Sequence, residues 1–234
     1  MSRIFEKGYG TTEKKLDNFE KYIRRQIMTR FLARYELFKM QVNIKGNIIE
    51  CGVHHGGGLM AWAKLSAGLE PYAFDRRIIG FDTFNGFPSI HENDQGSVSS
   101  ENGEMRLGGL DTGYDVFEEL TDVIDEFDQN RFLNQFQKVE LVRGDATVTI
   151  PQYVKDNPHL LVSLLFLDFD LYEPTKVALE QLLSRMPKGA ILAFDEINNP
   201  WWPGETQALL EMLDLRKYEI NRFSFEPNIS YIVL

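Results

Sequence analysis

The chain has 234 residues, 43% of them hydrophobic, and a net charge of −10 at pH 7, which indicates a soluble globular protein with a sizeable core. The acidic balance argues against nucleic acid as the main partner, and the absence of an apolar run of about 18 residues, or of an apolar stretch near the N-terminus, argues against a membrane partner and a signal peptide. Because Cys51 is the only cysteine, an internal disulfide is excluded, and we expect a cytoplasmic protein.

The first predicted element is helical. Residues 16–42 carry apolar side chains close to helical spacing, so we predict that residues 1–44 form an appendage of one or two helices. An amphipathic segment outside the main domain makes a homo-oligomer the expected state. The apolar positions are Leu16, Phe19, Ile23, Ile27, Phe31, Leu32 and Tyr35.

Residues 45–234 are predicted to form an α/β domain, because apolar strand-like segments alternate with helical patterns. Strands are predicted for a short segment that ends at Glu50 and for residues 77–82, 139–145, 164–170 and 190–196, and helices for residues 59–69, 116–127, 149–155, 175–183 and 203–215. This alternation implies a parallel sheet with right-handed crossovers. A terminal hairpin of residues 218–225 and 229–234 adds an antiparallel strand.

A long segment of residues 85–113 interrupts this alternation. It has little periodicity and is rich in Gly, Ser, Asn and Glu. Because a stretch of this length without regular structure is unusual inside a compact domain, we predict that it is a lid or substrate loop.

The most informative feature is a pair of apolar strands that end in carboxylates. The first ends in Asp168 and Asp170, and the second in Asp195 and Glu196. Ligands of open α/β sheets bind beyond the carboxyl ends of the strands, so these four side chains should lie beside one crevice. Crowded carboxylates repel one another, and a hard divalent cation with oxygen ligands is the natural solution.

Three other strand ends carry candidate ligand-binding residues. The turn after the first strand contains Glu50, Gly52 and Gly56, and its glycines let a ligand approach the backbone closely. Its spacing is not the dinucleotide fingerprint, and an ordinary strand-to-helix turn is the alternative. Asp82 ends the second strand and could accept hydrogen bonds from ribose hydroxyls, or act as a solvated acid or helix cap. Asp145 could bind an adenine amino group or cap the next helix.

Trp201 and Trp202 follow the last acidic strand. Two consecutive tryptophans beside a crevice predict a stacking wall for a sugar or flat ring of the substrate. Burial under residues 85–113, or a subunit contact, is the alternative.

Together these residues resemble a class I S-adenosylmethionine-dependent methyltransferase, and more narrowly the macrocin O-methyltransferase family, which methylates sugar hydroxyls in antibiotic biosynthesis. The resemblance extends over about residues 45–234, and the segment from Asp168 to Thr175 is its most specific part. It is carried by residues 49–53 with Gly56 and Gly57, and by residues 80–88, 144–146, 167–175 and 194–196.

The resemblance implies a Rossmann-like sheet of seven strands with the last strand antiparallel, S-adenosylmethionine as cofactor and a divalent cation, usually Mg²⁺. By position, the metal ligands would be Asp168, Asp195 and Glu196. The chain departs from the family pattern at Glu196, where an aspartate is frequent, and at Phe169, where a glycine is frequent. The cofactor would be held by Glu50, Gly52, Val53, Gly56, Gly57, Asp82, Thr83, Asp145, Ala146 and Asp168.

We therefore expect methyl transfer to a hydroxyl of a deoxysugar, carried by a nucleotide or a glycosylated natural product. Asp168 is the first candidate for the general base and Asp170 the second, and the two would share one strand face if the strand extends that far. Three alternatives remain: methylation of a phenolic or catechol hydroxyl, a non-catalytic nucleotide-binding scaffold and, least favoured, a nicotinamide-dependent oxidoreductase.

Overall fold

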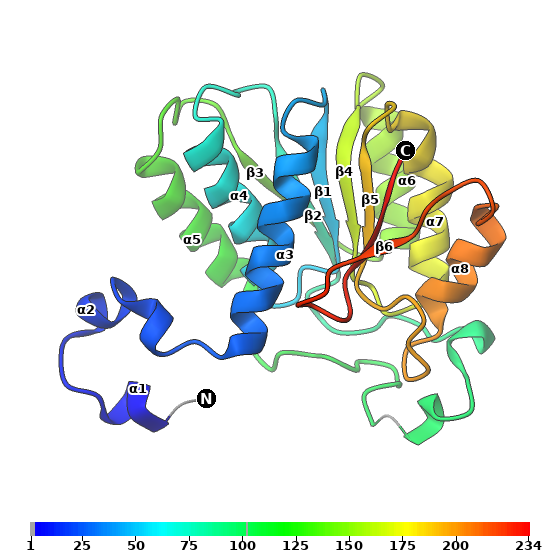
Figure 1. The fold of residues 1–234 in the computed structure, drawn as a ribbon, viewed down its shortest axis with the longest axis horizontal. Coiled ribbons are helices and arrows are strands. Elements are labelled where there is room, and N and C mark those ends of the chain that lie inside the picture. Colours follow the sequence, from blue (N-terminus) through cyan, green and yellow to red (C-terminus); the bar gives the residue numbers. More distant parts are fainter. Residues whose placement is uncertain (1–2, 102) are drawn as a thin grey trace.

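The computed structural model describes residues 3–101 and 103–234, so residues 1 and 2 of the predicted appendage and Asn102 of the predicted lid lie outside the described residues. Seven strands form one sheet in the order β3-β2-β1-β4-β5-β7-β6, with β7 antiparallel to β5 (Figure 1). The predicted fold class is thereby confirmed. The strands are β1 Asn47–Cys51, β2 Ile78–Asp82, β3 Val139–Arg143, β4 Val162–Leu167, β5 Ile191–Phe194, β6 Asn221–Arg222 and β7 Ser230–Val233.

Helices cover both faces of this sheet, because the central strands carry apolar side chains on both of their faces. Ile48 and Phe166 belong to the core beneath one helical layer, and Ile49 and Leu165 to the core beneath the other. The first layer is α3 Arg25–Gln41, α4 Gly57–Leu69 and α5 Val116–Gln129. The second is α6 Ala146–Asp156, α7 Tyr172–Leu182 and α8 Gly204–Met212 (Figure 1). No helix among the described residues is long and apolar enough to cross a membrane.

The register of the central strands determines which side chains meet at the carboxyl edge. Cys51 pairs with Leu167, and Leu167 pairs with Phe194. The turns that follow β1, β4 and β5 therefore start side by side at the carboxyl edge of the sheet. Between β1 and β4 the strand order reverses, and such a point is where open α/β sheets bind ligands.

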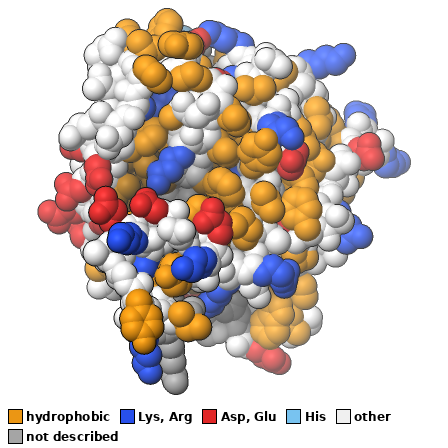
Figure 2. Space-filling view, turned by 60° about the vertical axis from the view of Figure 1, so that its left-hand side comes forward, with side chains coloured by type: hydrophobic (Ala, Val, Ile, Leu, Met, Phe, Trp, Pro, Cys, Tyr) orange, Lys and Arg blue, Asp and Glu red, His pale blue; other side chains and the backbone are white. Residues whose placement is uncertain are grey.

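The predicted N-terminal appendage is divided between two environments. Helix α3 packs on the sheet, and its Ala33, Leu37 and Phe38 are fully buried. The preceding helices, α1 Arg3–Lys7 and α2 Thr12–Leu16, extend away from the sheet (Figure 1). The side of the molecule that comes forward in Figure 2 shows hydrophobic side chains spread among charged ones. The predicted homo-oligomer stays a prediction.

Most of the predicted strands are shorter in the structure, and two of these differences matter for the site and for the sheet edge. Strand β4 ends at Leu167, and Asp170 adopts a left-handed backbone with φ 62°. Asp168 and Asp170 therefore do not continue one strand face, which corrects that expectation. The segment predicted as a strand over residues 218–225 pairs only at Asn221 and Arg222, and the next residue, Phe223, is buried and stacks on Tyr231 with ring centroids 5.1 Å apart.

The predicted lid of residues 85–113 is anchored to the domain. It contains the short 3-10 helices Glu92–Asp94 and Ser99–Glu101. Asp94 is 1% exposed, and its carboxylate accepts hydrogen bonds from the backbone N–H groups of Tyr172 at 2.6 Å and His91 at 2.8 Å. This buried carboxylate fastens the segment to the beginning of α7.

Gly52 is required where the turn after β1 passes β4. Its φ is 89°, and a Cβ added there would lie 1.9 Å from the backbone oxygen of Asp168. We expect Gly52→Ala to lower the free energy of unfolding by about 3 kcal/mol, because it combines left-handed strain with a backbone overlap. Urea titration measures this loss. At Gly57 an added Cβ meets nothing within 4 Å, so Gly57→Ala should instead stabilise the helix by up to about 1 kcal/mol. Equal effects of the two changes would contradict the backbone explanation.

Candidate active site

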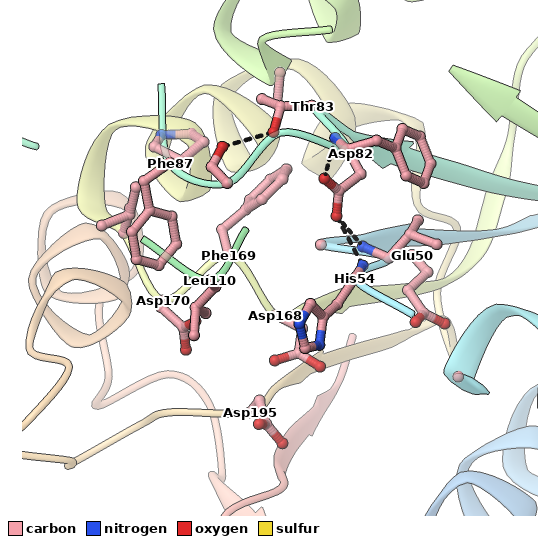
Figure 3. Close-up of a pocket in the computed structure, with 18 of the residues that line it drawn as sticks. Glu50, His54, Asp82, Thr83, Phe87, Leu110, Asp168, Phe169, Asp170 and Asp195 are labelled. Carbon is pink, nitrogen blue, oxygen red and sulfur yellow. Dashed lines mark hydrogen bonds between the residues drawn. The ribbon is translucent and has the colours of Figure 1, made fainter. Parts of the chain in front are cut away.

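A cavity of about 510 Å³ opens at the carboxyl edge of the parallel strands (Figure 3). Its volume is in the range of pockets that hold small ligands. It brings together most of the predicted site residues. Gly56 and Trp201 are the two that do not line it. The predicted residues that do are Glu50, Gly52, Val53, Gly57, Asp82, Thr83, Asp145, Ala146, Asp168, Asp170, Asp195, Glu196 and Trp202.

Asp82 organises the end of the cavity beside the glycine turn. One carboxylate oxygen accepts the backbone N–H groups of Val53 at 2.7 Å and His54 at 2.8 Å, and the other accepts that of Phe84 at 2.7 Å (Figure 3). A carboxylate has about four acceptor positions, so these three bonds leave capacity for a ligand hydroxyl. Asp82 thus links the turns after β1 and β2 while facing the cavity.

Asp145 is a helix cap in this structure. Its carboxylate accepts the backbone N–H of Thr147 at 2.9 Å and the hydroxyl of the same residue at 2.7 Å, at the start of α6. The capping alternative is therefore present, and Asp145 and Ala146 also line the cavity. Binding of an adenine group there stays a prediction.

Glu50 lies beneath the glycine turn and is 1% exposed. The indole N–H of Trp62 donates to one of its oxygens at 2.5 Å, and Gly58 leaves room for the other, since a Cβ there would be 2.3 Å away. Burial raises the pKa of Glu50 to about 7, although the nearby Arg34 guanidinium acts in the opposite direction. Its carboxyl group is held in one orientation toward the cavity.

The opposite end of the cavity is a cluster of four acidic side chains, from the turns after β4 and β5. Asp195, Asp170 and Glu196 are at most 8% exposed. Burial and mutual repulsion raise the pKa values of Asp168 and Asp170 well above their usual range and that of Glu196 to about 7. The predicted crevice of carboxylates is thus present at the level where the strand register brings the turns together.

Two arginines that the sequence interpretation missed enter this cluster from α3. Arg30 Nη1 lies 3.0 Å from one oxygen of Asp195, and its Nη2 lies 3.4 Å from Asp168. Arg34 Nη2 is 4.0 Å from the same Asp168 oxygen. The available signal was their spacing of four residues, which continues toward the buried Leu37 and Phe38 on the same helical face.

The aromatic wall of the cavity differs from the predicted tryptophan pair. Trp202 lines the cavity and packs edge-on against Phe87 of the 85–113 segment, with ring centroids 5.7 Å apart. Trp201 is 43% exposed and does not line the cavity. The wall therefore combines Trp202 with Phe87, and Phe169 and Leu110 lie nearby (Figure 3).

The residues implied as metal ligands fit a hard divalent cation in their chemistry. Asp195 Oδ1 is buried and accepts no hydrogen bond, although Arg30 Nη1 lies 2.9 Å away in a geometry that supports only an ion pair. In the part of the chain that the structure describes, however, no three acidic, His or Cys side chains are already arranged to hold a metal. The guanidinium of Arg30 lies between Asp168 and Asp195 instead.

Comparisons with known proteins identify the family. The family model described as macrocin O-methyltransferase (TylF) matches residues 21–211. The crystal structure of the calicheamicin methyltransferase CalS11 is 33% identical, with a TM-score of 0.93 over 99% of this chain and 89% of that one. The apo structure of CalS11, described as a TDP-rhamnose 3'-O-methyltransferase, is 31% identical, with a TM-score of 0.84 over 99% and 90% of the two chains.

A more distant structure, that of the O-methyltransferase NovP, is 20% identical, with a TM-score of 0.66 over 87% of this chain and 78% of that one, and it supports the fold alone. Among curated protein sequences no significant match was found. The family match extends over most of the chain and over all of the parallel strands. The chain therefore belongs to the macrocin O-methyltransferase (TylF) family of S-adenosylmethionine-dependent O-methyltransferases.

Proposed function

We propose that this protein transfers the methyl group of S-adenosylmethionine to a hydroxyl of a deoxysugar, carried by a nucleotide or a glycosylated natural product. The observation that carries the proposal is the continuity of the cavity, which has the glycine turn and Asp82 at one end and the carboxylates at the other. A donor bound at the first end would present its methyl group to an acceptor at the second. The name of the relative CalS11, a TDP-rhamnose 3'-O-methyltransferase, supports a sugar acceptor.

The donor end offers a partner for each part of the cofactor. Asp82 would accept a hydrogen bond from a ribose hydroxyl through its remaining acceptor position. Asp145 and Ala146 would lie against the adenine, and Glu50 would face the amino-acid portion. Gly52 lets the glycine turn lie against the backbone of Asp168, where a Cβ would overlap it, and so sets the position of the turn that the cofactor would pass.

At the acceptor end, the chain would position a hydroxyl oxygen in line with the donor methyl group. Holding the two reactants in a near-attack geometry supplies a large part of the acceleration. Asp168 is the proposed proton acceptor, because its carboxylate lines the cavity in the acidic cluster, where the acceptor would bind. Asp170 is the second candidate.

A divalent cation would be held by Asp168, Asp195 and Glu196. When bound, such a cation orients neighbouring hydroxyls and lowers the pKa of the one that is attacked. The side chain of Arg30, which pairs with two of these carboxylates, would have to yield to it. The lid residues Phe87 and Leu110 would exclude water from the reaction and shape the choice of acceptor.

A phenolic or catechol acceptor is the second candidate, and the aromatic wall favours it. Phe87 and Trp202 meet edge to face, and Phe169 lines the same cavity, so a flat ring could pack among them. Product formation from a deoxysugar nucleotide such as TDP-rhamnose and from a catechol, followed by mass spectrometry, distinguishes the two. Methylation of the catechol alone would overturn the sugar assignment.

The proposal is tested first by calorimetry with S-adenosylhomocysteine. We expect micromolar binding to the wild type and a dissociation constant about 10- to 100-fold larger for Asp82→Ala, because the change removes the ribose acceptor and three bonds that shape the pocket. Asp156→Ala is the control, since Asp156 pairs with Gln152 on the exposed side of α6. Absence of binding to the folded wild type would refute the methyltransferase pocket and favour the scaffold alternative.

A further inference from the structure

Glu205 is a buried carboxylate that the sequence interpretation did not single out. It is the second residue of α8 and is fully buried. Its pKa lies well above the usual range, because of burial and of the nearby Asp170 and Asp195. No salt bridge to it occurs among the described residues. Burying a carboxyl group among other acids, without a cation partner, lowers the stability of the fold. We therefore expect Glu205 to have a role other than stabilisation.

The two oxygens of Glu205 bind the two turns that carry the acidic cluster. Oε1 accepts the backbone N–H of Asp170 at 3.2 Å, and Oε2 accepts the backbone N–H of Glu196 at 3.1 Å. One turn follows β4 and the other follows β5. A single side chain therefore bridges the loops whose carboxylates face the cavity.

The backbone of these turns needs such support. Asp170 and Asn198 both have left-handed backbones, with φ of 62° and 64°, a conformation that costs a residue with a side chain about 1–2 kcal/mol. The hydroxyl of Thr206, the next residue of α8, accepts the N–H of Asn198 at 2.9 Å. The first turn of α8 thus holds both acidic loops through adjacent side chains.

The start of α8 is itself fixed in place. A Cβ added at Gly204 would lie 2.2 Å from the carboxylate of Asp94 and 2.4 Å from the backbone nitrogen of Tyr172. The first turn of α8 is therefore packed tightly against the start of α7 and against Asp94 of the 85–113 segment. Movement of Glu205 relative to the loops is restricted by this packing.

We propose that Glu205 is a positioning residue, which sets the separation of the Asp168–Asp170 turn from the Asp195–Glu196 turn and so the geometry of the carboxylates that act on the acceptor. This inference rests on the proposed function for its consequence, but not for the contact itself. A glutamine keeps the shape of the side chain yet presents an N–H₂ group to one of the two N–H donors, so it can hold only one turn.

The experiment compares Glu205→Gln with Glu211→Gln. Glu211 lies on the same helix but pairs with Tyr172 and Lys176 outside the cavity, which makes it a matched control. For Glu205→Gln we expect kcat to fall about 100-fold and Mn²⁺ affinity, measured by electron paramagnetic resonance, about 10-fold. S-adenosylhomocysteine affinity should stay within about threefold of the wild type, because the donor end does not contact Glu205. If Glu205→Gln instead lowered cofactor affinity and thermal stability as much as it lowered kcat and Mn²⁺ affinity, the role of Glu205 would be merely structural.

Hydrogen exchange, followed by mass spectrometry, tests the contact independently of activity. The amides of Asp170 and Glu196 should exchange slowly in the wild type, and one or both should exchange faster in Glu205→Gln but not in Glu211→Gln. Rapid exchange of both amides in the wild type would refute the bridge even if the variant does not fold. Faster exchange in the variant with unchanged kcat would refute the positioning role. If the wild type methylates no acceptor, the proposed function fails, and exchange still decides whether Glu205 holds the turns.

Discussion

Replacing Asp168 with asparagine should reduce kcat by at least about 1,000-fold while leaving the affinity for S-adenosylhomocysteine within about threefold of the wild type. The asparagine side chain has nearly the same shape but cannot accept a proton from the acceptor hydroxyl, and it offers a cation only a neutral oxygen. The donor end of the cavity, organised by Asp82 and the glycine turn, does not depend on this carboxylate. Single-turnover kinetics together with calorimetry measure both effects.

Asp170→Asn is the matched comparison for this prediction. Asp170 has a left-handed backbone and is held by Glu205, so its replacement should reduce kcat by about tenfold, through altered packing rather than loss of the base. A larger loss for Asp170→Asn than for Asp168→Asn would transfer the base to Asp170. Loss of cofactor binding by folded Asp168→Asn would instead assign Asp168 to the cofactor pocket.

The sheet was predictable because its signals are local. Buried strands such as β4 are continuous apolar runs, and helices such as α5 alternate apolar and charged positions, so each element can be recognised from its own residues. The extent of the last strands was not predictable in the same way. The segment predicted over residues 218–225 pairs only at Asn221 and Arg222, and no local pattern marks where that pairing begins or ends.

The acidic end of the site was predictable for the same reason, because its carboxylates follow apolar strands directly in the sequence. Their partners were not. Arg30 lies 138 residues from Asp168 in the chain, and Glu205 reaches Asp170 across 35 residues. Such pairs depend on how α3 and α8 pack on the sheet. The tryptophan pair shows the converse, since neighbours in sequence diverged and only Trp202 reached the cavity.

Arg30 provides the second large effect, because it is the cation that lies between Asp168 and Asp195. Its pKa is raised further by these two carboxylates against the opposing effect of burial, so it remains charged. Without Arg30, the negative charges of Asp168 and Asp195 would repel each other with less positive charge nearby to offset the repulsion. In the presence of a chelator, we therefore expect Arg30→Met to lower the free energy of unfolding by about 2 kcal/mol, below the value for a fully buried pair because the Arg30 side chain is 24% exposed.

The same change should strengthen metal binding. In the wild type a divalent cation must displace Arg30 from two carboxylates, whereas in Arg30→Met it would enter a cluster that lacks any competing charge at that position. We expect the dissociation constant for Mn²⁺ to fall about tenfold, and Mg²⁺ to raise the melting temperature more in the variant than in the wild type. Arg25→Met, an exposed position of the same helix, should change neither. Weaker Mn²⁺ binding by Arg30→Met would mean that the guanidinium supports the metal site, and unchanged binding would mean that the metal does not use Asp168 and Asp195.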